Sequence, residues 1–180
     1  MSRKETEARV SAVIPRLYVI CRAWGCAPDV CDEVVQEAVI AALDKYQQLR
    51  DPDLLETWLI SILNNCHRMY LRKYRRETCY EEDSLIDERT PDASLEQERI
   101  VIQVRIAMSH LSDEHRKVLT LVDMEGLSYR DVADALGIRI GTVMSRVSRA
   151  RESLRRQLKQ LLNQQEQPSG QSAPTLRSLK

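Results

Sequence analysis

The chain has no phenylalanine and little glycine or proline, which narrows the folds open to it. Its 180 residues include five Gly, six Pro, two Trp and six Tyr. So few turn-forming residues leave little room for a hairpin-rich β fold. The core must consist mainly of Leu, Ile, Val and Ala, and these residues, with abundant Glu, Arg and Gln, favour helices. We therefore expect an all-α protein.

Long apolar runs are missing as well. No run approaches the roughly 18–20 apolar residues of a membrane span, and the N-terminus, MSRKETEAR, is too charged for a signal peptide. We therefore expect a cytoplasmic protein that is not itself a membrane protein and whose thiols stay reduced. The cysteines form no C-x-x-C pair, and the first three, spaced by five, do not share one helical face. We expect ordinary thiols, with no metal site and no cofactor, at Cys21, Cys26, Cys31, Cys66 and Cys79.

Neither sign of charge is in excess, because 27 basic and 27 acidic residues give a net charge of zero. That average hides three blocks. Residues 65–76 carry five bases and no acid, residues 77–99 carry nine acids and two Arg, and residues 137–180 carry nine bases and two acids. Two basic blocks flank an acidic one, which suggests two separate phosphate-facing surfaces rather than one basic stripe.

Helical periodicity divides the chain into two small helical domains. The first, residues 5–76, contains three apolar helical patterns. Residues 77–94 lack sustained periodicity and are acidic, so we interpret them as a flexible linker. The second domain covers residues 95–162, and the polar composition of residues 163–180 is typical of a disordered tail.

Capping signals locate several helix ends within these domains. Pro15 predicts a kink in the first helix, because proline cannot donate a backbone hydrogen bond. Asp29 and Asp53 are the expected N-caps of the second and third helices, and Ser112 is the expected cap of a helix in the second domain.

The stretch GLSYRDVADALGIRIGTVMSRVSRA, residues 126–150, has the pattern of a helix-turn-helix. Gly126 can adopt the left-handed conformation that ends a helix. Ser128 and Asp131 form a capping box for the next helix, and Gly137 supplies the turn after it. The second helix then carries one apolar stripe, at spacings of four, three and four, formed by Val143, Val147, Ala150 and Leu154.

The opposite face of this second helix is basic and rich in hydroxyls, as in a recognition helix that enters the major groove. An ordinary helical hairpin with a solvated basic face would share many of these features. The spacing of Ala133 and Gly137, which fits a close helix crossing, and the lack of acids from Ile138 to Arg151 favour DNA. We predict base contacts near Ser145 and Arg149 and phosphate contacts at Arg139, Arg151 and Arg155. The predicted DNA-binding surface is made of Arg139, Thr142, Met144, Ser145, Arg146, Ser148, Arg149 and Arg151.

The chain resembles bacterial RNA polymerase sigma factors of the small, two-domain extracytoplasmic-function (ECF) class. Residues 95–158 are similar to sigma region 4, and the run from Leu111 to Arg155 matches it almost without a break. Residues 10–76 are similar to region 2. The matching marks of region 2 are Pro15-Arg16-Leu17, the DEVVQE run of residues 32–37, and Trp58-Leu59-x-x-Ile62 with Asn65. Two family features are absent: an acidic residue near Met69, and aromatic residues in the helix after VQE.

The resemblance implies a protein that does no covalent chemistry. It would bind core RNA polymerase, read two promoter elements and help to open the duplex. It also implies that an anti-sigma factor holds the protein inactive, and that the acidic linker passes through the RNA exit path of the polymerase. Polymerase binding would fall on Asp32, Val35, Gln36 and Glu37, although these residues taken alone also fit a solvated acidic face.

The melted strand of the downstream promoter element needs a basic groove and aromatic platforms for unstacked bases. The end of the third helix offers both. We predict that this strand is bound by Asn65, Arg68, Tyr70, Arg72, Lys73, Tyr74, Arg75 and Arg76. The resemblance implies that the loop from Gln48 to Leu54 receives a flipped base, whereas Trp58 fits the core better than a platform.

Three other functions fit parts of the sequence. A stand-alone helix-turn-helix regulator would need only the second domain and would bind duplex DNA, usually as a dimer, without polymerase. A sigma-like adaptor that titrates a regulator is disfavoured by the basic blocks. An enzyme is the least favoured, because there is no Gly-rich phosphate loop, no metal-ligand spacing, and no histidine beyond His67, His110 and His115.

Overall fold

The computed structural model describes residues 3–49, 51–77 and 95–165, and its described residues contain helices but no strand. The first part of the chain forms α1 (Arg3–Ala23), α2 (Pro28–Lys45), the short 3-10 helices η1 (Tyr46–Gln48) and η2 (Pro52–Leu54), and α3 (Leu55–Glu77). The second part forms α4 (Leu95–Ser109), α5 (Asp113–Leu119), the π-helical turn η3 (Thr120–Met124), α6 (Tyr129–Leu136) and α7 (Ile140–Gln165). The predicted all-α fold is confirmed.

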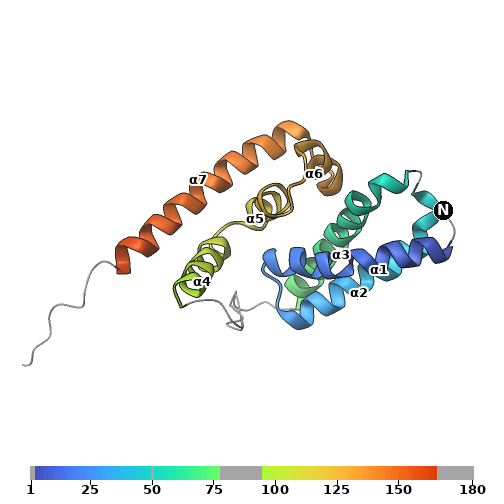
Figure 1. Ribbon diagram of the computed structural model, residues 1–180, viewed down its shortest axis with the longest axis horizontal. Helices are drawn as coiled ribbons and strands as arrows, with labels where there is room; N and C mark the ends of the chain where they lie inside the picture. The colour runs from blue at the N-terminus through green and yellow to red at the C-terminus, as the bar shows by residue number, and fades with distance from the viewer. Residues whose placement is uncertain (1–2, 50, 78–94, 166–180) are drawn as a thin grey trace, which may run out of the picture.

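The first three helices form a bundle in which α2 packs against both α1 and α3 (Figure 1). In α1 the inward positions recur every three or four residues, so one side of the helix is buried although Pro15 lies inside it. Each fully buried Leu or Val contributes about 1.5–3 kcal/mol relative to an exposed one. The centre of this core is formed by Val10, Leu17, Ile20, Trp24, Val34, Leu59 and Leu63.

Two of the predicted caps in this bundle are wrong. The N-cap of α2 is Ala27, with Pro28 in the first helical position and no side-chain cap. Proline is suited to that position because its fixed φ is helical and its missing N–H would have had no partner there. The aspartate that caps η2 is Asp51, which accepts a hydrogen bond from the backbone N–H of Asp53 (3.0 Å).

The capping signals of the second part are confirmed. Ser112 caps α5 and accepts from the backbone N–H of His115 (3.4 Å). Ser128 caps α6, accepting from the N–H of Asp131 (3.1 Å) while its hydroxyl donates to the Asp131 carboxylate (2.6 Å). Gly126 has the predicted positive φ of 69°, and it follows the π-helical turn η3.

The long helix α7 is the centre of the second bundle, because α4, α5 and α6 all pack against it (Figure 1). The predicted stripe is confirmed: Val143, Val147 and Ala150 are buried and Leu154 is half-buried. The helix ends at Gln165 rather than at Leu162, so the first three residues of the expected tail are helical. Residues 166–180 and most of the expected linker, residues 78–94, lie outside the described residues.

The two bundles pack directly against each other. Helix α6 lies on α3 (Figure 1), and buried side chains of both bundles form one continuous apolar cluster. That cluster joins Leu59 and Leu63 of α3 to Val132 and Ala135 of α6. Among the described helices, none combines the length and the apolar character needed to cross a bilayer.

Candidate nucleic-acid interface

The turn between α6 and α7 has the geometry of a helix-turn-helix. Gly137 adopts a left-handed φ of 65°, and its N–H and that of Ile138 bond to carbonyls of the last turn of α6. These two backbone hydrogen bonds end α6, and the chain changes direction within three residues. Ala133 is buried, as expected where two helices cross closely. The sequence therefore determines how α7 leaves α6.

The predicted recognition surface lies on the outward face of α7 and just before it. Ser145 donates its hydroxyl to the carbonyl of Thr142 (3.0 Å), which leaves the oxygen free to accept. Met144 is 53% exposed, so one apolar side chain lies among the polar and basic groups of this face. Thr142 is half-buried, and the residues of this surface that are exposed are Arg139, Met144, Ser145, Ser148, Arg149 and Arg151.

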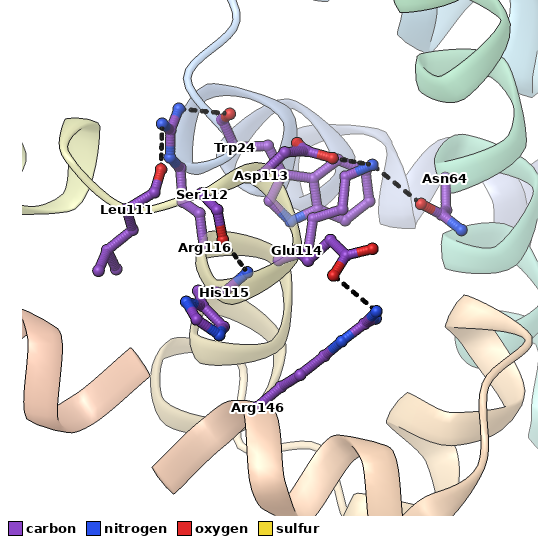
Figure 2. Close-up of polar contacts among 10 residues, drawn as sticks. Trp24, Asn64, Leu111, Ser112, Asp113, Glu114, His115, Arg116 and Arg146 are labelled. Atoms are coloured by element: carbon purple, nitrogen blue, oxygen red, sulfur yellow. Dashed lines mark hydrogen bonds and ion pairs between the residues drawn. The ribbon is translucent and has the colours of Figure 1, made fainter. Parts of the chain in front are cut away.

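Two arginines of this surface are held by acids of the same domain. Arg146 forms an ion pair with Glu114 of α5 (2.6 Å) (Figure 2), and Arg151 binds Asp123 through two guanidinium nitrogens, one at 2.9 Å. The hydrogen bond from Asp123 raises the pKa of Arg151 above its usual range. A phosphate would have to compete with these carboxylates, whereas the exposed Arg149 has no acid against it in any described ion pair.

The end of α3 forms the second predicted surface. Arg68, Arg72 and Lys73 are exposed, and Asn65 lies on the same outer side of the helix. The rings of Tyr70 and Tyr74 are stacked, with centroids 6.2 Å apart and an interplanar angle of 14°. Burial raises the pKa of Tyr70. Arg75 and Arg76 belong to α3, but their side chains lie outside the described part of the chain.

The predicted polymerase-facing set on α2 needs one correction. Val35 is only 1% exposed and packs in the core of the first bundle, because it lies one residue after the inward Val34 and four after the inward Cys31. Asp32, Gln36 and Glu37 are exposed. The neighbouring Glu33 faces the end of α3, where Lys73 lies 4.0 Å from its carboxylate.

A set of polar contacts between the two bundles was not foreseen from the sequence (Figure 2). Lys117 of α5 is 5% exposed, donates to Asn64 of α3 (3.1 Å), pairs with Asp113 (3.2 Å) and lies over the ring of Trp24 (4.9 Å to the centroid). Burial lowers its pKa. In the sequence, the only indication that Lys117 points inward is that it lies four residues before an apolar residue, the buried Leu121.

Two arginines extend this contact. Arg116 donates to the carbonyl of Trp24 (2.9 Å) and also to the carbonyls of Ser109 and Leu111 (both 2.9 Å), so it joins α1 to the α4–α5 turn. Arg16 of α1 pairs with Glu56 of α3 and with Glu125, next to Gly126. A second hydrogen bond from Arg16 reaches the Glu125 carbonyl (3.1 Å).

His67 lies in the same region and is buried. Its ring packs against Trp24, with centroids 5.4 Å apart, and its Nδ1 atom has no hydrogen-bond partner among the described residues. Burial, together with the charge of Lys117, lowers the pKa of His67 to about 4. The imidazole is therefore neutral at physiological pH.

Three cysteines whose spacing fits no single helical face come together in the fold. Cys21 is in the last turn of α1, Cys26 in the following loop and Cys31 in the first turn of α2. Gly25, with a φ of 91°, reverses the chain between them, so the periodicity of a single helix does not apply. Their three Sγ atoms all lie within 4.8 Å of one another. Hydrogen bonds from the Cys21 and Cys26 thiols lower the pKa of Cys31 to about 4.

Comparison with known proteins finds a family match in each part of the chain. Residues 10–77 match the Sigma-70 region 2 family, and residues 102–154 match the Sigma-70, region 4 family. The ECF RNA polymerase sigma factor EcfG of Rhodopseudomonas palustris is 34% identical over 149 residues, covering 81% of this chain and 80% of that protein. This chain belongs to the ECF RNA polymerase sigma factors.

One further relative and two solved structures are similar to this sigma factor. The ECF sigma-E factor of Haemophilus influenzae is 33% identical over 72% of this chain and 75% of its own length. The sigma factor RpoE, solved in complex with the anti-sigma factor NepR from Bartonella quintana, has a TM-score of 0.72 and 28% identity, covering 87% of this chain and 98% of that one. CnrH, solved with the cytosolic domain of CnrY, shares the fold at a TM-score of 0.62 and 22% identity, covering 91% of this chain and 90% of that one.

Proposed function

We propose that this sigma factor binds core RNA polymerase and divides promoter recognition between its two domains. Residues 95–162 read the upstream (−35) element as duplex, and residues 5–76 bind the polymerase and the melted downstream (−10) strand. The observation that carries this proposal is the exposed Arg and Ser face of α7, which a glycine turn directs away from the core. A basic helix end with two stacked tyrosines lies on the other domain of the same chain.

The −35 surface combines exposed arginines with adaptable hydroxyls. Arg149 can bind guanine O6 and N7 in a bidentate manner, and Ser145 and Ser148 can accept or donate. Arg139 and Arg151 serve as phosphate contacts, which position the helix without reading bases. Arg146 and Thr142 are only partly accessible, so they support this surface from its inner edge.

The −10 surface suits unstacked bases. The Tyr70–Tyr74 pair offers an aromatic platform, and Asn65, Arg68, Arg72 and Lys73 provide polar and basic groups around it. Base stacking on an aromatic side chain is worth about 1–3 kcal/mol per base, and flipping a base out of the duplex costs a few kcal/mol. Strand capture of this kind assists melting without covalent chemistry, so the protein acts as a regulatory subunit rather than as an enzyme.

The polymerase contact falls on the exposed acidic side of α2. Asp32, Gln36 and Glu37 are exposed on α2, and Val35 packs in the core beneath them. The protein would work in the cytoplasm, where its polymerase and promoter are. The proposed passage of the acidic linker through the RNA exit path concerns residues outside the described part of the chain.

Control by an anti-sigma factor is part of the proposal. Two structurally similar proteins were solved with partners: the sigma factor RpoE with the anti-sigma factor NepR, and CnrH with the cytosolic domain of CnrY. In this chain α6 covers part of α3, and the two domains share one apolar cluster. A partner that inserts between them would replace the apolar contacts of that interface.

Run-off transcription tests the proposed function. Purified core polymerase is assayed with and without the sigma factor on a genomic promoter library, and discrete start sites that depend on both proteins are the expected result. A matched pair of variants, Arg149→Ala and the double variant Tyr70→Ala/Tyr74→Ala, should reduce transcription through different promoter elements. Absence of transcripts, together with tight duplex binding by the protein alone, would instead show a stand-alone helix-turn-helix regulator.

A further inference from the structure

The three cysteines of the first domain have a geometry that no promoter-binding role explains. Cys21, Cys26 and Cys31 come from the end of one helix, the following loop and the start of the next helix. Their Sγ atoms lie within 4.8 Å of one another, and Cys21 and Cys31 are buried while Cys26 is half-buried. Two of the thiols are therefore shielded from solvent, and the third is partly accessible.

Packing alone is an incomplete explanation of this group. A buried free cysteine commonly behaves as a small hydrophobic residue. Here, however, three thiols converge, and the partly buried Cys26 is one of them although it packs at the edge of the core. In a tetrahedral zinc site with Zn–S bonds of about 2.3 Å, the sulfur atoms lie roughly 3.8 Å apart. Three sulfur atoms no more than 4.8 Å apart thus need to approach by no more than about 1 Å.

We infer that Cys21, Cys26 and Cys31 form a binding site for a thiophilic divalent cation, Zn²⁺, with the fourth ligand supplied by solvent or a small molecule. Sulfur ligands favour zinc over Mg²⁺ or Ca²⁺, which prefer oxygen. The loop that holds Cys26 gives the ion a path to the buried sulfur atoms. Zinc binding at these cysteines requires neither polymerase nor promoter DNA and can be measured separately from the proposed function.

The surroundings compensate the charge of such a site. Three thiolates around Zn²⁺ carry a net charge of −1. Arg22 is close enough to Cys31, and Arg116 and Lys117 are close enough to Cys26, to interact with them electrostatically. Burying this complex is therefore less costly than burying an isolated anion.

The site also adjoins the contact between the two domains. The turn from Trp24 to Cys26 supplies the carbonyl that accepts from Arg116, and it places the Trp24 ring beneath Lys117. A metal held by Cys21, Cys26 and Cys31 fixes both ends of that turn. Zinc binding is therefore expected to stabilise the packed arrangement of the domains.

Cobalt substitution tests the site on the full-length protein. The chain is purified under reducing, metal-free conditions and titrated with Co²⁺, then with Zn²⁺ as competitor. We expect thiolate-to-cobalt charge-transfer absorbance that saturates at one ion per chain, is reversed by zinc, and is accompanied by a rise in Tm on zinc binding.

Cysteine variants locate the ligands. Cys26→Ser removes a proposed ligand at the half-buried loop position. Loss of a group that only supports a metal ligand weakens binding by roughly 10- to 100-fold, so we expect this variant to weaken zinc binding by more than that. The matched control is Cys66→Ser/Cys79→Ser, which keeps the three clustered thiols and should bind as the natural chain does. A circular dichroism spectrum establishes that each variant is folded. No charge-transfer band, or equal loss in the control, would overturn the inference.

Discussion

Arg149 is the arginine of the recognition helix best placed to read a base, because it is exposed and unpaired among the described ion pairs, while Arg146 and Arg151 are held by acids. We expect Arg149→Ala to cost about 1–3 kcal/mol of binding to the −35 element. Fluorescence anisotropy with cognate and scrambled duplexes, with core polymerase present, measures this cost. Arg155→Ala, an exposed arginine further along α7, is the control and should weaken both duplexes alike. Equal weakening by Arg149→Ala would show that it only contacts phosphate.

Lys117 is a buried charge that joins the two domains. Lys117→Met keeps the aliphatic stem but leaves the Asn64 amide oxygen without its donor, which costs about 1–3 kcal/mol for a buried polar group. We therefore expect a lower free energy of unfolding in urea. The exposed Lys159→Met on α7 is the matched control and should change stability little. An unchanged midpoint for Lys117→Met would mean that its hydrogen bond and ion pair only offset the cost of burying the ammonium group.

At the scale of single elements, α6 depends on its N-terminal cap. The hydroxyl of Ser128 is bonded to both the backbone N–H and the carboxylate of Asp131. We expect Ser128→Ala to lower the free energy of unfolding by about 0.5–2 kcal/mol. Thermal unfolding monitored at 222 nm measures the loss. Ser11→Ala, on the exposed side of α1, provides the control and should leave Tm nearly unchanged.

The ends of α6 and α7 were predictable because their signals are local. A serine three residues before an aspartate, and a glycine at the turn, determine hydrogen bonds within four residues. The ends of α2 and η2 were predicted less well. Asp29 and Asp53 are each preceded by a proline, and the proline takes the first helical position and moves the cap to the residue before it.

At the scale of the whole molecule, the buried His67 makes stability depend on pH. An unfolded histidine has a pKa of about 6.5, whereas burial beside Trp24 and the positive charge of Lys117 lower that of His67 to about 4. The charge of Arg116 also lowers the pKa of His67, whereas Asp113 and Cys31 raise it. Between the two pKa values the unfolded chain binds a proton that the folded chain does not, so stability rises with pH in this window.

This contribution is fully present above about pH 6.5 and is lost as the pH falls toward about 4. The loss is on the order of 3 kcal/mol at the acid end of the window. Urea unfolding at several pH values measures it. His67→Gln, which removes the titrating ring, should flatten the profile relative to the natural chain. His110→Gln, at an exposed position, is the control and should keep the full dependence.

The sequence by itself determined the helices, the division into two domains, the helix-turn-helix and the identity of its exposed face. Each of these rests on periodicity or on hydrogen bonds between residues a few positions apart, so the pattern of side chains carries the information. The predicted recognition residues could be placed for the same reason: a continuous helix has one apolar stripe, and the rest of its surface faces outward.

Only the tertiary structure decided which residues meet across the fold. Lys117 reaches Asn64 and Trp24, Arg16 reaches Glu125, and three cysteines converge although their spacing fits no single helical face. These contacts depend on where the chain reverses and on how α6 lies on α3, and both are set by the shape of the shared apolar core.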